Sequence, residues 1–149
     1  MSSDTVYMSQ ALELAQQAAL AGEVPVGAVV VADNQIIGQG YNRSIQNSDP
    51  TAHAEIVALR DAAAYLGNYR LVNCDLYVTI EPCTMCVGAM VHARIRRVIF
   101  GALEPRAGAL ASQLKLMDER YFNHSIKWQG GVLEQDCAAL VKDFFKRRR

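Results

Sequence analysis

The 149-residue sequence lacks several features that would place it in a specialised class of protein. No apolar run approaches the ~18 residues of a membrane span, and the first residues are too polar for a secretory signal peptide. There is no internal repeat, low-complexity tract or linker, and the formal net charge is zero, so the chain is not a polycation. We therefore expect one globular domain over residues 1–149, in the cytoplasm and away from membranes.

Cysteine is scarce, with four residues in the chain. Thiols stay reduced in the cytoplasm, so disulfides are not expected. Cys74 and Cys137 are predicted to be buried small hydrophobic residues. Cys83 and Cys86 differ, because they follow Pro82 in a Pro-Cys-x-x-Cys motif. Proline suits the first turn of a helix, where its missing N–H has no partner to lose.

Hydrophobic periodicity predicts alternating helices and strands. The predicted helices span 7–20, 52–66, 82–93 and 133–147, with a short helical piece near 114, and the predicted strands span 26–31, 35–41, 76–80, 97–101 and 125–129. Asp49 or Thr51 is expected to cap the second helix, because side-chain oxygens accept from free first-turn N–H groups. A hairpin turn at 33–34 and later strand–helix–strand units predict antiparallel and parallel neighbours. The expected fold class is α/β, a three-layer α/β/α arrangement with a mixed five-stranded sheet between helices.

Residues with metal-binding chemistry fall at two predicted helix starts. Cys83 and Cys86 are neighbours on a helix, so both sulfurs can reach one ion, and a helix N-terminus favours the thiolate that binds metal. His53 lies in the first turn of another helix and adds an imidazole nitrogen. Two thiolates and an imidazole suit Zn²⁺ better than Mg²⁺ or Ca²⁺. Three protein ligands leave the fourth position to water, which indicates a catalytic zinc site.

Glu55 lies two positions beyond His53 and is not needed as a ligand. At about 3.6 residues per turn, this spacing turns the two side chains ~200° apart, which suits two different tasks. Zinc can lower the pKa of bound water from ~15.7 to about 7, on the order of 10 kcal/mol towards making hydroxide available. A carboxylate beside that water is a suitable general acid and base.

Two other interpretations of the cysteine pair remain open from the residues alone. A closed structural zinc site would need a fourth ligand from Cys74, Cys137, His92 or His124. His92 lies six residues past Cys86, off the ligand face, and we leave it out. A redox protein would need a reversible disulfide between the two motif cysteines, which bound zinc should prevent.

The H-x-E…P-C-x-x-C pattern is already known as the signature of zinc nucleobase deaminases, so its meaning is not deduced from this chain. Within the cytidine/deoxycytidylate deaminase superfamily, the sequence resembles the bacterial tRNA-specific adenosine deaminases over nearly its whole length. The segments that carry the resemblance are 23–28, Asn42, 49–56, 77–79, 81–83, 88–95, 100–102 and 143–145 with the basic residues that follow.

The resemblance implies a cytidine deaminase-like fold and one Zn²⁺ per subunit on His53, Cys83 and Cys86. It implies hydrolytic deamination, in which zinc-bound hydroxide attacks C6 of a flipped-out adenine. Glu55 would protonate N1 and then the leaving amine, which departs as ammonia. The backbone N–H of Cys83 would stabilise the developing oxygen charge. The product would be inosine at the wobble position of a tRNA anticodon.

The resemblance also implies substrate contacts at Val26, Asn42 and Ala54. Asn42 is expected to hold the purine ring, and Val26 to form part of its apolar wall, although a turn residue and a core strand residue are their plainer interpretations. One position departs from the family, which usually has Asp where this chain has Glu104. The extra methylene alters any backbone or ribose contact made there.

The C-terminus combines aromatic and cationic side chains. Five of the fifteen Lys and Arg residues lie in the last eight positions. RNA loops are bound by stacked bases and by cations on phosphates, so Phe144, Phe145, Arg147 and Arg148 are candidate contacts to an anticodon stem-loop. The alternative is a core-facing Phe with a solvated basic tail. The family forms homodimers, and the apolar helical stretch 87–91 could pack on a copy of itself.

Two alternative functions share the same zinc ligands. A deaminase of free guanine, cytosine or a nucleotide would use the same chemistry on a small molecule. A non-catalytic zinc-binding module would use the ligands and not Glu55.

Overall fold

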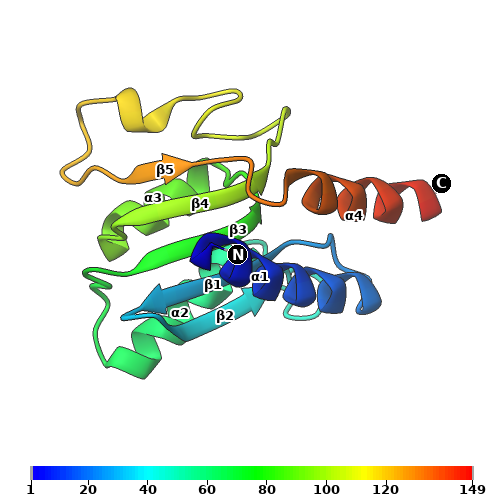
Figure 1. Ribbon diagram of the computed structural model, residues 1–149, viewed down its shortest axis with the longest axis horizontal. Helices are drawn as coiled ribbons and strands as arrows, with labels where there is room; N and C mark the ends of the chain where they lie inside the picture. Colours follow the sequence, from blue (N-terminus) through cyan, green and yellow to red (C-terminus); the bar gives the residue numbers. More distant parts are fainter. Residues whose placement is uncertain (1, 149) are drawn as a thin grey trace.

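The computed structural model describes residues 2–148, arranged as a sheet between two layers of helices (Figure 1). The elements are α1 (Ser3–Leu20), β1 (Gly27–Ala32), β2 (Gln35–Tyr41), α2 (Ala54–Leu66), β3 (Asp75–Ile80), α3 (Thr84–Ala93), β4 (Arg97–Ala102), a 3₁₀ turn (Leu116–Asp118), β5 (Lys127–Gln129) and α4 (Glu134–Arg147). The predicted α/β class with a mixed five-stranded sheet is confirmed. None of the helices in this part of the chain is both long enough and apolar enough to cross a bilayer.

The order of the strands is β2-β1-β3-β4-β5. β1 runs antiparallel to β2 and β3, whereas β3, β4 and β5 run parallel. Gly27 pairs with Tyr41, and Ile80 pairs with Ala102. The start of β1 therefore lies at the same edge as the ends of β2, β3 and β4. We call this edge the carboxyl edge, because β3 and β4 end there.

The helices divide between the two faces of the sheet. α1 and α4 pack on one face, where Met8 and Cys137 lie with strand residues such as Ile99. α2 and α3 pack on the other face, where Leu59 and Met90 join the larger core cluster. Cys74 and Cys137 are buried free thiols, as predicted. The two layers leave the starts of α2 and α3 at the carboxyl edge.

Two glycines of β2 bring α2 close to the sheet. A Cβ at Gly38 would lie 2.6 Å from the carbonyl oxygen of Ala58. A Cβ at Gly40 would lie 2.7 Å from the backbone nitrogen of the same residue. Real Cβ atoms do not approach backbone this closely, so only glycine permits this helix–strand distance. The close packing fixes the start of α2 against the hairpin.

The prediction of a capping side chain at Asp49 or Thr51 is wrong. α2 begins at Ala54, and its cap position is His53. Asp49 instead accepts hydrogen bonds from the backbone N–H and hydroxyl of Thr51, at 2.9 and 2.7 Å. A distant residue satisfies the helix start, because the Asn42 side-chain oxygen accepts from the N–H of Ala54 at 2.8 Å.

Other differences from prediction concern boundaries and one surface. α3 begins at Thr84 with Cys83 as its cap residue, two positions later than the proline implied. β5 is shorter than predicted and spans Lys127–Gln129. Val87 and Val91 are buried inside the chain, at 0% and 3% exposure, so the stretch 87–91 does not offer them to a second copy.

The close approach of α2 gives a stability prediction. Gly40→Ala should lower the free energy of unfolding by about 2 kcal/mol, because overpacking a filled interface costs ~1–3 kcal/mol. Gly88→Ala on α3 is the matched control, since its Cβ would meet nothing within 4 Å. It should be neutral or stabilising by up to about 1 kcal/mol, because alanine is the better helix former. Urea denaturation of the zinc-loaded protein measures both, and equal stability of the two variants would contradict this account.

Candidate active site

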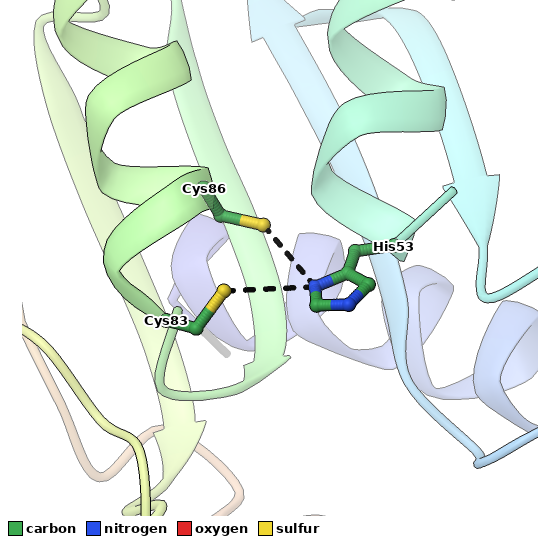
Figure 2. A group of neighbouring side chains, drawn as sticks. All are labelled: His53, Cys83 and Cys86. Atoms are coloured by element: carbon green, nitrogen blue, oxygen red, sulfur yellow. Dashed lines mark hydrogen bonds between the residues drawn. The ribbon is translucent and has the colours of Figure 1, made fainter. Parts of the chain in front are cut away.

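Three ligand side chains meet at the carboxyl edge. His53 comes from the start of α2, and Cys83 and Cys86 come from the start of α3. One ligand atom from each lies within 4.8 Å of the others. Figure 2 shows both sulfurs pointing at Nδ1 of the imidazole, and the two separations are 3.6 Å for Cys83 and 3.5 Å for Cys86. The structure therefore brings together the three ligands that the sequence predicts.

The donor geometry fits zinc. Tetrahedral Zn²⁺ with Zn–S of about 2.3 Å and Zn–N of about 2.0–2.1 Å places sulfur and nitrogen about 3.5 Å apart. The observed separations of 3.5 and 3.6 Å match this edge of a tetrahedron. In the described part of the chain, no fourth His, Cys or carboxylate belongs to the group. Two thiolates and one imidazole thus fit one Zn²⁺ per subunit, with one position left open.

The residues that a closed site would recruit lie elsewhere. Cys74 donates its S–H to the carbonyl of Val72. His124 lies 2.7 Å from the carbonyl oxygen of Ile95 through Nε2. Cys137 packs under Gly101 in the opposite helix layer, and His92 is exposed on α3. The geometry therefore favours the open arrangement over a structural zinc site.

The ligands influence one another's ionisation. A hydrogen bond from the Cys86 thiol, reinforced by His53, outweighs burial and lowers the pKa of Cys83 to about 4. The same contact between the two cysteines, together with burial, raises the pKa of Cys86. Hydrogen bonding to Cys83 raises the pKa of His53. Both cysteines bind metal as thiolates, so zinc binding would release the protons that the free thiols carry.

Glu55 lies in the first turn of α2 and is only 4% exposed. Burial raises the pKa of its carboxyl group to about 7. His53 lowers this pKa and Cys83 raises it, so the carboxyl lies within electrostatic reach of the metal ligands. A carboxyl group with a pKa near neutrality accepts and returns a proton with little free-energy cost.

Two hydrogen bonds link the predicted substrate residues Val26, Asn42 and Ala54, and Ala54 directly follows the ligand His53. The Asn42 N–H donates to the carbonyl of Val26 at 3.2 Å, and its side-chain oxygen accepts from Ala54. Val26 is half-buried, whereas Ala54 is fully buried. Asn42 therefore has a structural task at its amide oxygen, which leaves the NH₂ end for other partners.

The C-terminal candidates lie at the end of α4. Figure 1 shows α4 extending beyond the strands on the side where α1 ends. Arg148 donates to the carbonyl of Gly22, which follows α1, at 2.8 Å, and its guanidinium lies 4.5 Å from the ring centre of Phe144. Phe145 is 47% exposed, and the side chain of Arg147 is 83% exposed, 3.9 Å from Asp143. Phe145, Arg147 and Arg148 are exposed and Phe144 is half-buried, but Arg148 is bonded to the segment after α1.

Sequence reasoning missed two buried carboxylates at the same edge, Glu23 and Glu81. Glu23 is 2% exposed and Glu81 is 3% exposed. Burial would raise the pKa of Glu81, but hydrogen bonds from the Ser112 hydroxyl and from loop N–H groups outweigh it and lower the pKa. The one available signal was an acidic residue directly between a buried strand and the Pro-Cys motif.

An open zinc group beside a buried carboxyl, on this mixed sheet, defines the class of zinc-dependent hydrolytic deaminases. Comparison with known proteins agrees with this class. Residues 1–102 match the cytidine and deoxycytidylate deaminase zinc-binding region.

Full-length relatives narrow the class. A tRNA-specific adenosine deaminase of Haemophilus influenzae is 51% identical over 147 residues, which cover 98% of this chain and 85% of that protein. A solved structure from a study of A-to-I editing by tRNA:A34 deaminases at the wobble position superposes with a TM-score of 0.89. It is 42% identical and covers 91% of this chain and 99% of that one. A guanine deaminase from Nitrosomonas europaea superposes with a TM-score of 0.81 at 25% identity, covering 94% and 83%. The chain belongs to the cytidine and deoxycytidylate deaminase family and, within it, to the tRNA-specific adenosine deaminases.

The zinc group gives a prediction about metal content. Cys86→Ala should reduce bound zinc from about one per chain to well below half, because two remaining ligands form a poor tetrahedral site. Cys74→Ala is the matched control, since Cys74 is an equally buried thiol outside the group. Metal analysis after dialysis against a weak chelator reads out both variants. Full zinc retention by the Cys86 variant would remove that residue from the ligand set.

Proposed function

We propose that this protein converts adenosine to inosine at the wobble position of a tRNA anticodon by hydrolytic deamination. The observation that carries the proposal is the open His-Cys-Cys group beside the buried carboxyl of Glu55. Similarity to tRNA-specific adenosine deaminases over 98% of the chain supports adenosine in tRNA as the substrate. We also propose that residues 1–149 act as one deaminase domain.

His53, Cys83 and Cys86 would hold the zinc ion, which supplies Lewis acidity and lowers the pKa of water. In the proposed roles, Glu55 would take a proton from the attacking water and deliver it to N1 of adenine. It would then take the second proton from the hydroxyl formed at C6 and deliver it to the amine, so that the C6–N bond breaks, ammonia leaves and the C6 carbonyl of inosine forms. Burial holds the pKa of Glu55 near 7, which suits both directions of transfer. The N–H of Cys83, at the cap of α3, lies outside the helical hydrogen-bond ladder and would donate to the oxygen that develops negative charge as it bonds to C6.

The base would be held by Asn42 and Val26, which are linked by hydrogen bonds to each other and to Ala54. The Asn42 oxygen is committed to the start of α2, so the NH₂ group would donate to a ring nitrogen of the purine. Val26 would contact the ring through its half-buried side chain. The predicted contact of Ala54 with the base does not fit the structure, because Ala54 has no exposed surface and its N–H already donates to Asn42; Ala54 would instead hold the Asn42 side chain in place.

Replacing Glu55 tests the chemical role directly. Glu55→Ala should keep the zinc and the fold and lower turnover by ~10²–10⁴-fold, the range typical of a lost general acid and base. Conversion of adenosine to inosine in a wobble-containing stem-loop is measured beside zinc content. A variant that retains both zinc and wild-type turnover would exclude Glu55 from the reaction.

We propose that the polymer substrate reaches the exposed end of α4. Arg147 and Phe145 present a cation and an aromatic ring to solvent there. Phosphate neutralisation and base stacking are the two contributions that a single-stranded RNA loop offers. We further propose a homodimer acting in the cytoplasm, in line with the tRNA substrate.

The basic end of α4 gives a salt-dependence prediction. Replacing Arg147 and Arg148 together by glutamate should weaken tRNA binding and make the logarithmic salt slope shallower by about 0.7 for each lost phosphate contact. Arg147→Glu alone separates a phosphate contact from packing, because Arg148 also bonds Gly22 and contacts Phe144. Arg120→Glu, exposed in the long loop before β5, matches the charge change. If both α4 variants kept the salt slope of the wild type, the end of α4 would make no contact with the phosphates of the tRNA.

The second candidate is a deaminase of a small molecule, which the similarity to a guanine deaminase structure keeps in view. Incubation with an anticodon stem-loop, free adenosine, guanine and cytosine distinguishes the two. Inosine formed in the stem-loop alone supports the proposal, and turnover of a free base alone would replace it. Zinc binding without turnover of any of these substrates would indicate a non-catalytic module.

A further inference from the structure

Two buried carboxylates, Glu23 and Glu81, take no part in the proposed chemistry. A buried ionised carboxylate costs several kcal/mol unless hydrogen bonds replace its hydration. Both lie at the carboxyl edge, which also carries the metal ligands. Glu23 lies between α1 and β1, and Glu81 lies between β3 and Pro82. Their hydrogen-bond partners explain why the cost is tolerated.

Glu81 organises the loop 103–113 around its side chain. One oxygen accepts from the backbone N–H of Glu104 at 3.0 Å and from the Ser112 hydroxyl. The other oxygen accepts three further backbone N–H groups, at 2.8–3.1 Å, from Leu110, Ala111 and Ser112. Gly108 packs so closely that an added Cβ would lie 2.3 Å from the carboxyl group. The loop is therefore folded around one anionic acceptor.

Glu23 organises the loop 42–49 in the same way. Its two oxygens accept the backbone N–H groups of Ile45 at 3.2 Å and Gln46 at 2.8 Å. The loop is also tied to the segment before α2, because the N–H of Arg43 donates to the carbonyl of Ala52 at 2.9 Å. Charge-assisted hydrogen bonds of this kind are about twice as strong as neutral ones.

Both loops border the metal ligands. The N–H of Ala109 donates to the carbonyl of Pro82, directly before Cys83, at 2.9 Å. The loop 42–49 begins at Asn42, whose side chain holds Ala54, directly after His53. Each loop is thus joined by a hydrogen bond to a residue adjacent to a zinc ligand.

Each loop also presents an apolar side chain with an arginine nearby in sequence. In loop 42–49, Ile45 is 70% exposed and Arg43 lies two residues before it. In loop 103–113, Leu103 is 49% exposed and Arg106 is also exposed. Unstacked bases and phosphates of an RNA loop are recognised by this pairing of apolar and cationic groups.

We propose that Glu23 and Glu81 are positioning residues, whose buried carboxylates hold the loops 42–49 and 103–113 beside the metal ligands, where the two loops contact the RNA loop. This inference rests on the proposed tRNA substrate and assigns the structures that position it. Loops fixed before binding lose less conformational entropy when the RNA arrives. The carboxylates act through the loops, so their removal should weaken binding and leave the chemical step largely intact.

The test compares Glu23→Gln and Glu81→Gln with Glu13→Gln, the same change at an exposed position of α1. Glutamine keeps the shape but replaces one of the two acceptor oxygens by an NH₂ group, which faces the N–H donors of the loop. In both loop variants KM and Kd for a wobble-adenosine stem-loop should rise about tenfold, which corresponds to about 1.4 kcal/mol. kcat and zinc content should stay within about twofold, and hydrogen exchange should rise only in the loop that faces the altered residue.

A milder variant covers the case in which Glu81→Gln does not fold. Ser112→Ala removes one of the donors to Glu81 and should raise Kd by a smaller factor in the same direction. Unchanged Kd and exchange in all the loop variants would overturn the proposal, as would a fall in kcat with no change in KM. Wild-type binding of the stem-loop without inosine formation would remove the proposed activity and leave the loop assignment intact. Failure of the wild type to bind the stem-loop would overturn both.

Discussion

The starts of α2 and α3 meet at one edge of the sheet, and the site depends on how this meeting is stabilised. A helix N-terminus carries roughly half a positive charge. Two helix starts at one place would therefore repel each other and would also repel a dication bound between them. The cysteine ligands at the start of α3 offset this repulsion when they ionise, and hydrogen bonds from Cys86 and His53 lower the pKa of Cys83. A buried neutral or singly charged Glu55 then completes a site that is almost uncharged overall.

The mixed sheet is what makes the meeting possible. Because β1 runs against β2 and β3, its first residue lies at the edge where the others end. That reversal brings Asn42 to the start of α2, where a side chain from a different element takes the place of a local cap. One amide thus joins the hairpin to the helix that carries His53 and Glu55, so the position of the base-binding segment and that of the ligand are set together.

The ligand set was predictable because its signals are local: cysteine spacing at a helix start, and histidine and glutamate in one motif. The expected cap at Asp49 or Thr51 failed because local preference ignores a tertiary competitor, here Asn42. The loop-holding role of Glu23 and Glu81 was missed for a different reason. Their partners are loop N–H groups, which every residue except proline possesses. The hydrogen bond from Arg148 to Gly22 depends on how α4 is oriented relative to α1. Hydrophobic periodicity predicts each helix but not this orientation.

The ligands His53 and Cys83 are thirty residues apart in the chain and belong to different helices. An ion bound to both residues would therefore cross-link the chain and close residues 53–83, which contain α2 and β3, into a loop. By the chain-entropy reasoning used for disulfides, closing a ring of about this size restricts the unfolded chain by about 3–4 kcal/mol. A bound ion would thus give the protein the cross-link that its free cysteines do not form as a disulfide. The free energy of unfolding would then depend on the concentration of zinc.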